Sequence, residues 1–138
     1  MPVFGTGEKG FSLLELIIVV IIIAILATIA ISQYYPAKER ALDKEAKANL
    51  KLLQAAEKIY RMESSIYLSC ATTSCINTNL RLSLPSGSNR NWTYTVPSAS
   101  ANAFNARAAR NNPPSSWSRT WSIDQDDEDA SCSGSGCP

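Results

Sequence analysis

A long apolar run stands out near the start of the chain. Every residue from Leu16 to Ile31 is apolar except Thr28. As an α-helix, the stretch from Phe11 to Ile31 would extend about 31 Å, which is enough to cross the hydrocarbon core of a bilayer. Because a backbone in lipid must satisfy its own hydrogen bonds, a helix is the expected form of this single span.

The polar segment that follows continues the helical pattern. From Lys38 to Glu63 the chain is rich in Ala, Leu, Lys and Glu, which are strong helix formers. Apolar residues recur there at helical intervals, so we expect one stripe that packs on the rest of the chain. The stripe consists of Ala41, Ala48, Leu52, Ala55, Ile59, Met62 and Ile66. Pro36 removes a helical hydrogen bond, which predicts a bend at 34–36.

Beyond Ser65 the helical pattern gives way to short alternating segments. The positions that share a face are Trp92, Tyr94 and Val96, then Phe104, Ala106 and Ala108, then Trp117, Trp121 and Ile123. Clusters of Asn, Ser and Pro separate these segments and predict turns. We therefore predict an α+β fold, in which a long helix with an amphipathic outer half packs on a small sheet of three or four antiparallel strands.

Charge and composition narrow the chemistry. The 138 residues include 13 basic and 12 acidic ones, and there is no His. The near-neutral balance gives no overall field that would attract nucleic acid. The lack of His removes the commonest general base and metal ligand. We therefore do not expect an enzyme.

Two groups of side chains suggest binding, each with a simpler alternative. Arg107, Arg110 and Arg119 would form a basic patch for DNA if they shared a face, and are otherwise a solvated surface. The Trp residues offer stacking surfaces for nucleic-acid bases or surface glycans, but their alternation favours a role in the core of the sheet. Neither DNA nor glycan binding is supported further.

The acid Glu15 sits just inside the apolar run. A secretory signal peptide would have a core of only about 7–15 residues, ending at small residues such as those at 24–27. A plain membrane anchor explains the length of the run, but an acidic residue at mid-membrane costs about 2.5–3.5 kcal/mol. Neither interpretation explains why an acid stands at position 15.

The stretch Gly10-Phe11-Ser12-Leu13-Leu14-Glu15 closely resembles the processing site of type IV prepilins and of the pseudopilins of type II secretion. In that family a prepilin peptidase cuts after the glycine. The resemblance implies that Gly10 ends a leader peptide and that Phe11 becomes the N-methylated first residue. It also implies that Glu15 is the family's signature acid.

The resemblance further implies the type IV pilin fold and a division of the chain. Residues 1–10 would be the cleaved leader. Residues 11–35 would be the helix of the membrane and the filament core, and 36–65 its amphipathic continuation. Residues 66–138 would form a globular β head with a disulfide-tied loop and tail.

Cleavage would explain the position of Glu15. It creates an α-amine at Phe11, one helical turn from the acid. In a filament, the carboxylate of one subunit can pair with the amine of its neighbour. A buried charge is tolerable when it is paired. Glu15 and Phe11 are therefore the expected assembly residues.

The implied function is that of a structural subunit of a type IV pilus, serving adhesion, motility or DNA uptake. The precursor would sit in the inner membrane and the assembled filament outside the cell. Its partners would be copies of itself, the prepilin peptidase, the inner-membrane assembly platform and minor pilins. One alternative is a pseudopilin of a periplasmic type II secretion pseudopilus. A more distant one is a membrane-anchored extracytoplasmic binding module.

The four Cys residues all lie after the apolar run. In an exported segment, disulfides are the expected state. The spacing favours two local pairs, Cys70 with Cys75 and Cys132 with Cys137. One rival pairing ties the C-terminal tail to the loop after the helix. A zinc site of four thiolates is a further alternative.

An acidic run precedes the last two cysteines. Its carboxylates are Asp124, Asp126, Asp127, Glu128 and Asp129. The run is either a solvated turn or a calcium site, since hard cations bind clustered carboxylates. The EF-hand template does not fit, because Asp129 stands where it needs Gly. No other cofactor is expected.

Overall fold

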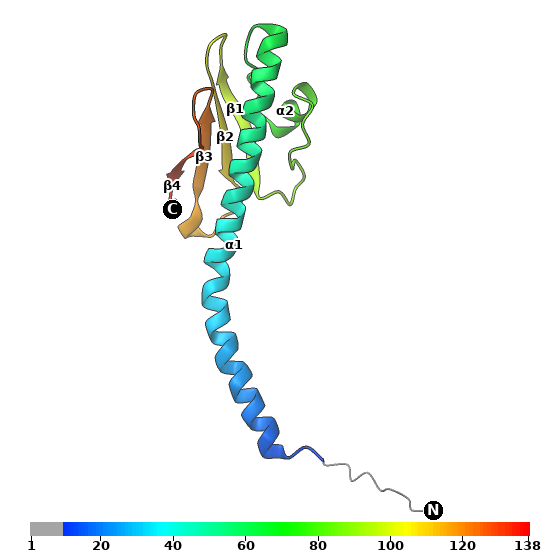
Figure 1. Cartoon of the computed structure of the whole chain (residues 1–138), viewed down its shortest axis with the longest axis vertical. Coiled ribbons are helices and arrows are strands. Elements are labelled where there is room, and N and C mark those ends of the chain that lie inside the picture. Colours follow the sequence, from blue (N-terminus) through cyan, green and yellow to red (C-terminus); the bar gives the residue numbers. More distant parts are fainter. Residues whose placement is uncertain (1–9) are drawn as a thin grey trace, which may run out of the picture. The chain divides into compact units, whose positions relative to one another are not determined.

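A computed structural model describes residues 10–138 (Figure 1). The chain divides into two compact units, of which the first ends at Lys38 and the second covers Glu39–Pro138. Helix α1, Leu13–Ser64, belongs to both. It continues through Pro36 without interruption, and the boundary between the units follows two residues later. The predicted long N-terminal helix is thus confirmed.

The second unit contains a four-stranded antiparallel sheet (Figure 1). Its strands are β1 (Trp92–Ala99), β2 (Phe104–Arg110), β3 (Arg119–Asp124) and β4 (Ser131–Gly134), and they lie side by side in chain order. The β1–β3 meander confirms the predicted alternating segments. The fourth strand continues the meander, and the α+β fold is therefore the predicted one.

The core of this unit lies between one face of the sheet and α1. The larger buried side chains of this core are Leu50, Leu53, Ile76, Trp92, Tyr94, Val96, Phe104, Trp121 and Ile123, with Ala46, Ala106 and Ala108 between them. The strands are in register so that these side chains meet: Tyr94 pairs with Ala108, and Ala108 with Trp121. The inward positions predicted for the strands are confirmed, apart from Trp117.

The apolar stripe predicted for the outer half of α1 is wrong. Its larger members are exposed, including Leu52 at 49% and Met62 at 79%. The buried face of α1 is instead Glu39, Asp43, Ala46, Leu50, Leu53, Gln54 and Glu57. Polar side chains can be buried there because the strands and loops supply partners for them. Hydrophobicity alone therefore does not mark the packed face.

Two local elements differ from the expected loops. Helix α2, Thr73–Asn79, begins inside the predicted loop, and Thr72 caps it by accepting a hydrogen bond from the Cys75 N–H at 3.2 Å. A short 3₁₀ helix, η1 (Ser115–Trp117), precedes β3, so Trp117 is outside the strand and only half-buried. Side-chain caps and single-turn helices leave little periodic signal in a sequence.

Candidate functional site

The N-terminal turn of α1 carries the residues of the processing motif. The Glu15 carboxylate accepts a hydrogen bond from the Ser12 backbone N–H at 3.3 Å, and Leu16 N–H donates to the Ser12 carbonyl at 3.2 Å. Ser12 is therefore the residue that starts the helix. Gly10, Phe11 and Glu15 are all exposed, and Phe11 is 76% exposed. A Cβ placed on Gly10 would meet nothing within 4 Å, so packing gives no reason for a glycine here.

Among residues 10–38, the apolar run has no packing partner. Its large side chains, from Leu13 to Ile31, are between 46% and 76% exposed. Thr28 bonds its own helix at the Ala24 carbonyl, so the run presents almost no unsatisfied polar group. The helix is long and apolar enough to cross a membrane, by length and composition. A helix that is apolar on all sides needs a lipid or protein environment on all sides.

A buried network of charges fastens α1 to the sheet in the second unit. The Arg119 guanidinium donates to Asp43 Oδ1 at 2.6 Å and to Glu39 Oε2 at 3.1 Å. Arg110 donates to the other Glu39 oxygen at 3.1 Å. Trp121 Nε1 donates to Asp43 Oδ1 at 2.9 Å. Because Arg119 is 2% exposed and Glu39 3% exposed, these ion pairs are shielded from water.

Burial and the neighbouring arginines shift the pKa of Glu39 in this network. Burial raises the pKa of Glu39, but the hydrogen bonds and charges of Arg110 and Arg119 more than offset this, and the pKa lies below its ordinary value. The Arg119 guanidinium also lies 5.1 Å from the ring centroid of Trp117 and 5.7 Å from that of Trp92. The network therefore holds ionised partners in a defined geometry, as an anchor for the helix.

This network overturns the predicted basic surface. Arg110 and Arg119 are buried in ion pairs, and only Arg107 is exposed, so the three do not form a patch for DNA. The signal for this existed in the sequence. Arg119 has the same strand parity as Trp121 and Ile123, which marks it as inward-facing. An inward-facing arginine predicts a buried acid opposite to it.

A second buried acid lies near the end of α1. Glu57 is 0% exposed, and its Oε2 accepts a hydrogen bond from the Leu68 N–H at 2.8 Å. Among the described residues its Oε1 has no hydrogen-bond partner. Burial raises the pKa of Glu57, and the Leu68 bond only partly counters this. Glu57 thus ties the loop after the helix back to the helix itself.

The structure contains two local disulfides. Cys70 is bonded to Cys75, and Cys132 to Cys137. Cys70 is buried in the core, and its backbone forms an antiparallel bridge with Val96 at the edge of β1. These are the pairs that the spacing favours. The first closes the loop at α2, and the second closes the tail after β4.

The acidic run forms a turn between β3 and β4. The Asp124 carboxylate accepts from the N–H groups of Asp126 and Asp127 at 2.9 and 3.0 Å, which holds the turn closed. Asp126, Glu128 and Asp129 are exposed. Within residues 10–138, no three His, Cys, Asp or Glu side chains are grouped so that they could hold a metal ion. The calcium site stays a hypothesis that this arrangement does not support.

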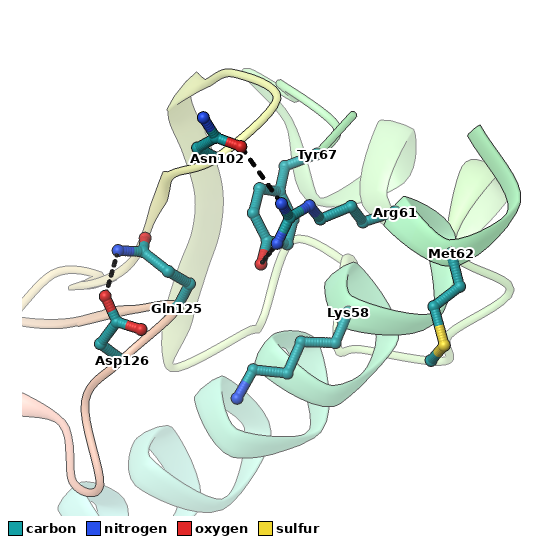
Figure 2. A pocket seen from close by; sticks show the side chains of 7 residues that line it. All are labelled: Lys58, Arg61, Met62, Tyr67, Asn102, Gln125 and Asp126. Atoms are coloured by element: carbon teal, nitrogen blue, oxygen red, sulfur yellow. Dashed lines mark hydrogen bonds between the residues drawn. The ribbon is translucent and has the colours of Figure 1, made fainter. Parts of the chain in front are cut away.

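An open cleft of about 520 Å³ lies beside the end of α1 (Figure 2). Arg61 crosses it and donates to the Asn102 side chain at 3.2 Å and to the Tyr67 hydroxyl at 3.3 Å. On the other wall, Gln125 donates to Asp126 at 2.8 Å. The lining of the cleft is part polar and part apolar, and its residues offer no nucleophile in contact with a base.

Comparisons with known proteins point to the N-terminal motif. Residues 6–31 match the family described as the prokaryotic N-terminal methylation motif. The chain is 36% identical over 98 residues to the type IV wide pilus major component of Thermus thermophilus, an alignment that covers 71% of this chain and 70% of that protein. It is also 45% identical over 64 residues to the type IV major pilin protein of Myxococcus xanthus.

The two relatives differ in how much of them is matched. The alignment with the Myxococcus protein covers 46% of this chain but only 29% of that protein's length. The Thermus protein is matched over more than two thirds of both chains. At 98 residues, the alignment with the Thermus protein is therefore much longer than the segment 6–31 that matches the motif family.

Proposed function

Because the chain belongs to the type IV pilin family, we propose that it is a structural subunit of a type IV pilus. The observation that carries this proposal is the bare apolar run of α1 with Glu15 in its first turn. The run needs lipid before assembly and neighbouring helices after it. The names of both relatives, which are pilus components, favour a pilus over a secretion pseudopilus.

We propose that maturation cuts the chain between Gly10 and Phe11 and methylates the Phe11 amine. The exposure of both residues supports access by a peptidase. The open space around Gly10 supports a glycine chosen for recognition rather than for packing. Residues 1–9 of the leader lie outside the described residues.

Assembly follows from the amine that this cut creates. In the filament, the Glu15 carboxylate of one subunit pairs with the Phe11 amine of the next. Both groups lie at the N-terminal turn of α1, so neighbouring helices that pack side by side bring them together with a small axial shift. A pair of opposite charges buried among apolar helices is stable only when both members are present. The pairing therefore sets the axial position of each incoming subunit.

The remaining roles follow from this assignment. The precursor resides in the inner membrane, with the head outside the cytoplasm, where both disulfides can form. The prepilin peptidase, the assembly platform and minor pilins are its partners. The function is structural rather than catalytic, and it requires no cofactor.

Filaments sheared from the cell surface test this proposal. Electron microscopy should show long fibres, and mass spectrometry of the fibres should find this chain as the main protein. Its N-terminal peptide should begin at Phe11 and carry one extra methyl group. Fibres that lack the chain, or a chain that retains Met1, would contradict the proposal.

A further inference from the structure

The second unit carries a cleft with a mostly apolar lining, to which three cationic residues also contribute. It has a volume of about 230 Å³ and is lined by Arg40, Asp43, Lys44, Lys47, Trp121 and Pro138. Arg40, Lys44 and Lys47 follow one another at helical intervals on α1, so they share one face. Asp43 does not neutralise them, because it is already paired with Arg119. Among residues 10–138, no carboxylate forms an ion pair with any of the three.

One wall of this cleft is aromatic. The Lys47 ammonium lies 4.3 Å from the centroid of the Trp121 ring, which holds that cation in place. Arg40 and Lys44 are exposed. Three cations that lack a carboxylate partner therefore lie at this cleft, and they favour an anionic partner.

The second unit also carries a negative surface, which could pair with these cations. The turn between β3 and β4 exposes the carboxylates of Asp126, Glu128 and Asp129. The turn is tied to α1, since the Gln54 amide donates to the Asp124 carbonyl at 2.6 Å and to the Asp127 carbonyl at 3.0 Å. Lys51 also pairs with Asp129 at 3.2 Å. A surface held in this way pays little ordering entropy when it binds.

The turn is anchored further along α1 than the cleft of its own chain. Its anchors, Lys51 and Gln54, lie about 6–15 Å beyond Lys47 and Lys44 along the helix axis. A second copy displaced by about that distance along the helix axis would bring its turn level with the cleft. A contact between two different surfaces of identical copies gives a ring if its rotation closes, and an open assembly if each copy is also displaced along the axis.

We propose that the acidic turn of one subunit, through Asp126 and Glu128, docks against the cationic cleft of a neighbouring subunit, Arg40, Lys44 and Lys47. This contact rests on the proposed filament function and adds a specific interface between heads. It is separate from the pairing of Glu15 with the Phe11 amine. The heads thereby select neighbours by charge as well as by the packing of their apolar helices.

Zero-length cross-linking of sheared filaments tests the contact. A carbodiimide joins a lysine amine to a carboxylate only where the two form a close pair, with loss of water. The Lys51–Asp129 pair within each chain should cross-link and serves as the internal positive control. The expected result is a covalent dimer whose joined peptides link Lys44 or Lys47 to the turn at 126–129. Dimers without this link, with the control link present, would overturn the proposal.

Charge reversal tests the same contact by assembly. Lys44→Glu and Glu128→Lys should each lower filament yield by at least about two-fold, and the double variant should recover most of the loss. Lys44 is preferred over Lys47, which also packs on Trp121. Arg107→Glu makes the same charge change on an exposed position of β2 and should leave the yield unchanged.

Two outcomes separate this contact from its alternatives. Wild-type chains that form no filaments would refute the proposed function itself. A second result would overturn the contact and assign the cleft to lipid headgroups. In that case Lys44→Glu would form normal filaments but would lose the binding to anionic phospholipid vesicles that wild type shows.

Discussion

The Glu15 carboxylate accepts a hydrogen bond from the backbone N–H of Ser12, at 3.3 Å, in the first turn of α1. This is one half of a capping box, in which an acid at the third helical position bonds the residue that starts the helix. The acid also lies at the positive end of the helix dipole. In a single subunit Glu15 therefore already has a local partner. In the proposed filament, the Phe11 amine of a neighbour would therefore add a charged partner to an acid that already accepts one hydrogen bond.

Removing one member of the buried network should be costly. We expect Arg119→Ala to lower the free energy of unfolding by about 3–5 kcal/mol, because it leaves Asp43 buried without its cation. The measurement is denaturant unfolding of the full chain in detergent micelles, followed by Trp fluorescence. Arg107→Ala, at an exposed position, should change the value by no more than about 0.5 kcal/mol. Equal effects of the two variants would show that the network does not anchor the head.

The two buried glutamates of α1 should have opposite effects on the pH dependence of stability. The pKa of Glu57 is raised by burial, so its folded state favours the protonated form. Its contribution is fully present below the ordinary value of 4.5 and is lost as the pH rises through the raised pKa. Glu57→Gln should therefore gain stability relative to wild type as the pH rises from 4 toward neutrality.

Glu39 provides the matched comparison. Its pKa lies below the ordinary value, so its contribution is present above 4.5 and is lost as the pH falls through the lowered pKa. Glu39→Gln should lose stability relative to wild type at neutral pH, and this loss should shrink in acid. Urea unfolding of both variants across the pH range measures these slopes. Slopes of the same sign would refute the assignment of the two environments.

The two disulfides should contribute unequally. On the loop-entropy model each closes a short loop and stabilises the fold by about 2 kcal/mol. Replacing Cys70 and Cys75 together by Ser should lower the free energy of unfolding more than replacing Cys132 and Cys137. The reason is that Cys70, at 1% exposed, is the one of the four that is buried in the core, where a Ser hydroxyl would need a hydrogen-bond partner. Thermal unfolding of both double variants gives the comparison.

Peptide mapping without reduction checks the connectivity itself. It should recover one peptide pair around 70–75 and another around 132–137. A peptide that joins Cys75 to Cys132 or Cys137 would contradict the local pairing.

The sequence predicted the elements with strong periodic signals. The apolar run and the helix-forming residues after it predicted α1. The alternation around Trp92 and Phe104 predicted β1 and β2. These features depend on neighbours in the chain, which a pattern can report. The resemblance around Gly10, Phe11 and Glu15 indicated the protein family, which composition alone does not indicate.

The packed face of α1 could not be read in the same way. Glu39 and Asp43 are buried because Arg119 meets them from positions 80 and 76 residues away in the chain. A helical pattern treats both acids as solvated, and so it assigned the apolar but exposed side chains of Leu52 and Ile59 to the core. Pairing between distant charges is a tertiary property, and it overrides the local hydrophobic pattern.

The filament yield of Glu15 variants tests the proposed pairing of the Glu15 carboxylate with the Phe11 amine most directly. Glu15→Leu and Glu15→Gln should both insert into the membrane normally. Gln keeps an oxygen that can accept the Ser12 N–H but has no charge, so it separates the start of the helix from the charge pairing. Glu63→Gln, at an exposed position of the last turn of α1, is the control. The measured quantity is the amount of this chain in sheared filaments relative to the amount in the membrane.

We predict that both Glu15 variants lower this ratio by at least about 100-fold, as expected for losing one member of a buried ion pair. The control should match wild type. Wild-type amounts of filament from Glu15→Gln would contradict the pairing of the Glu15 carboxylate with the Phe11 amine.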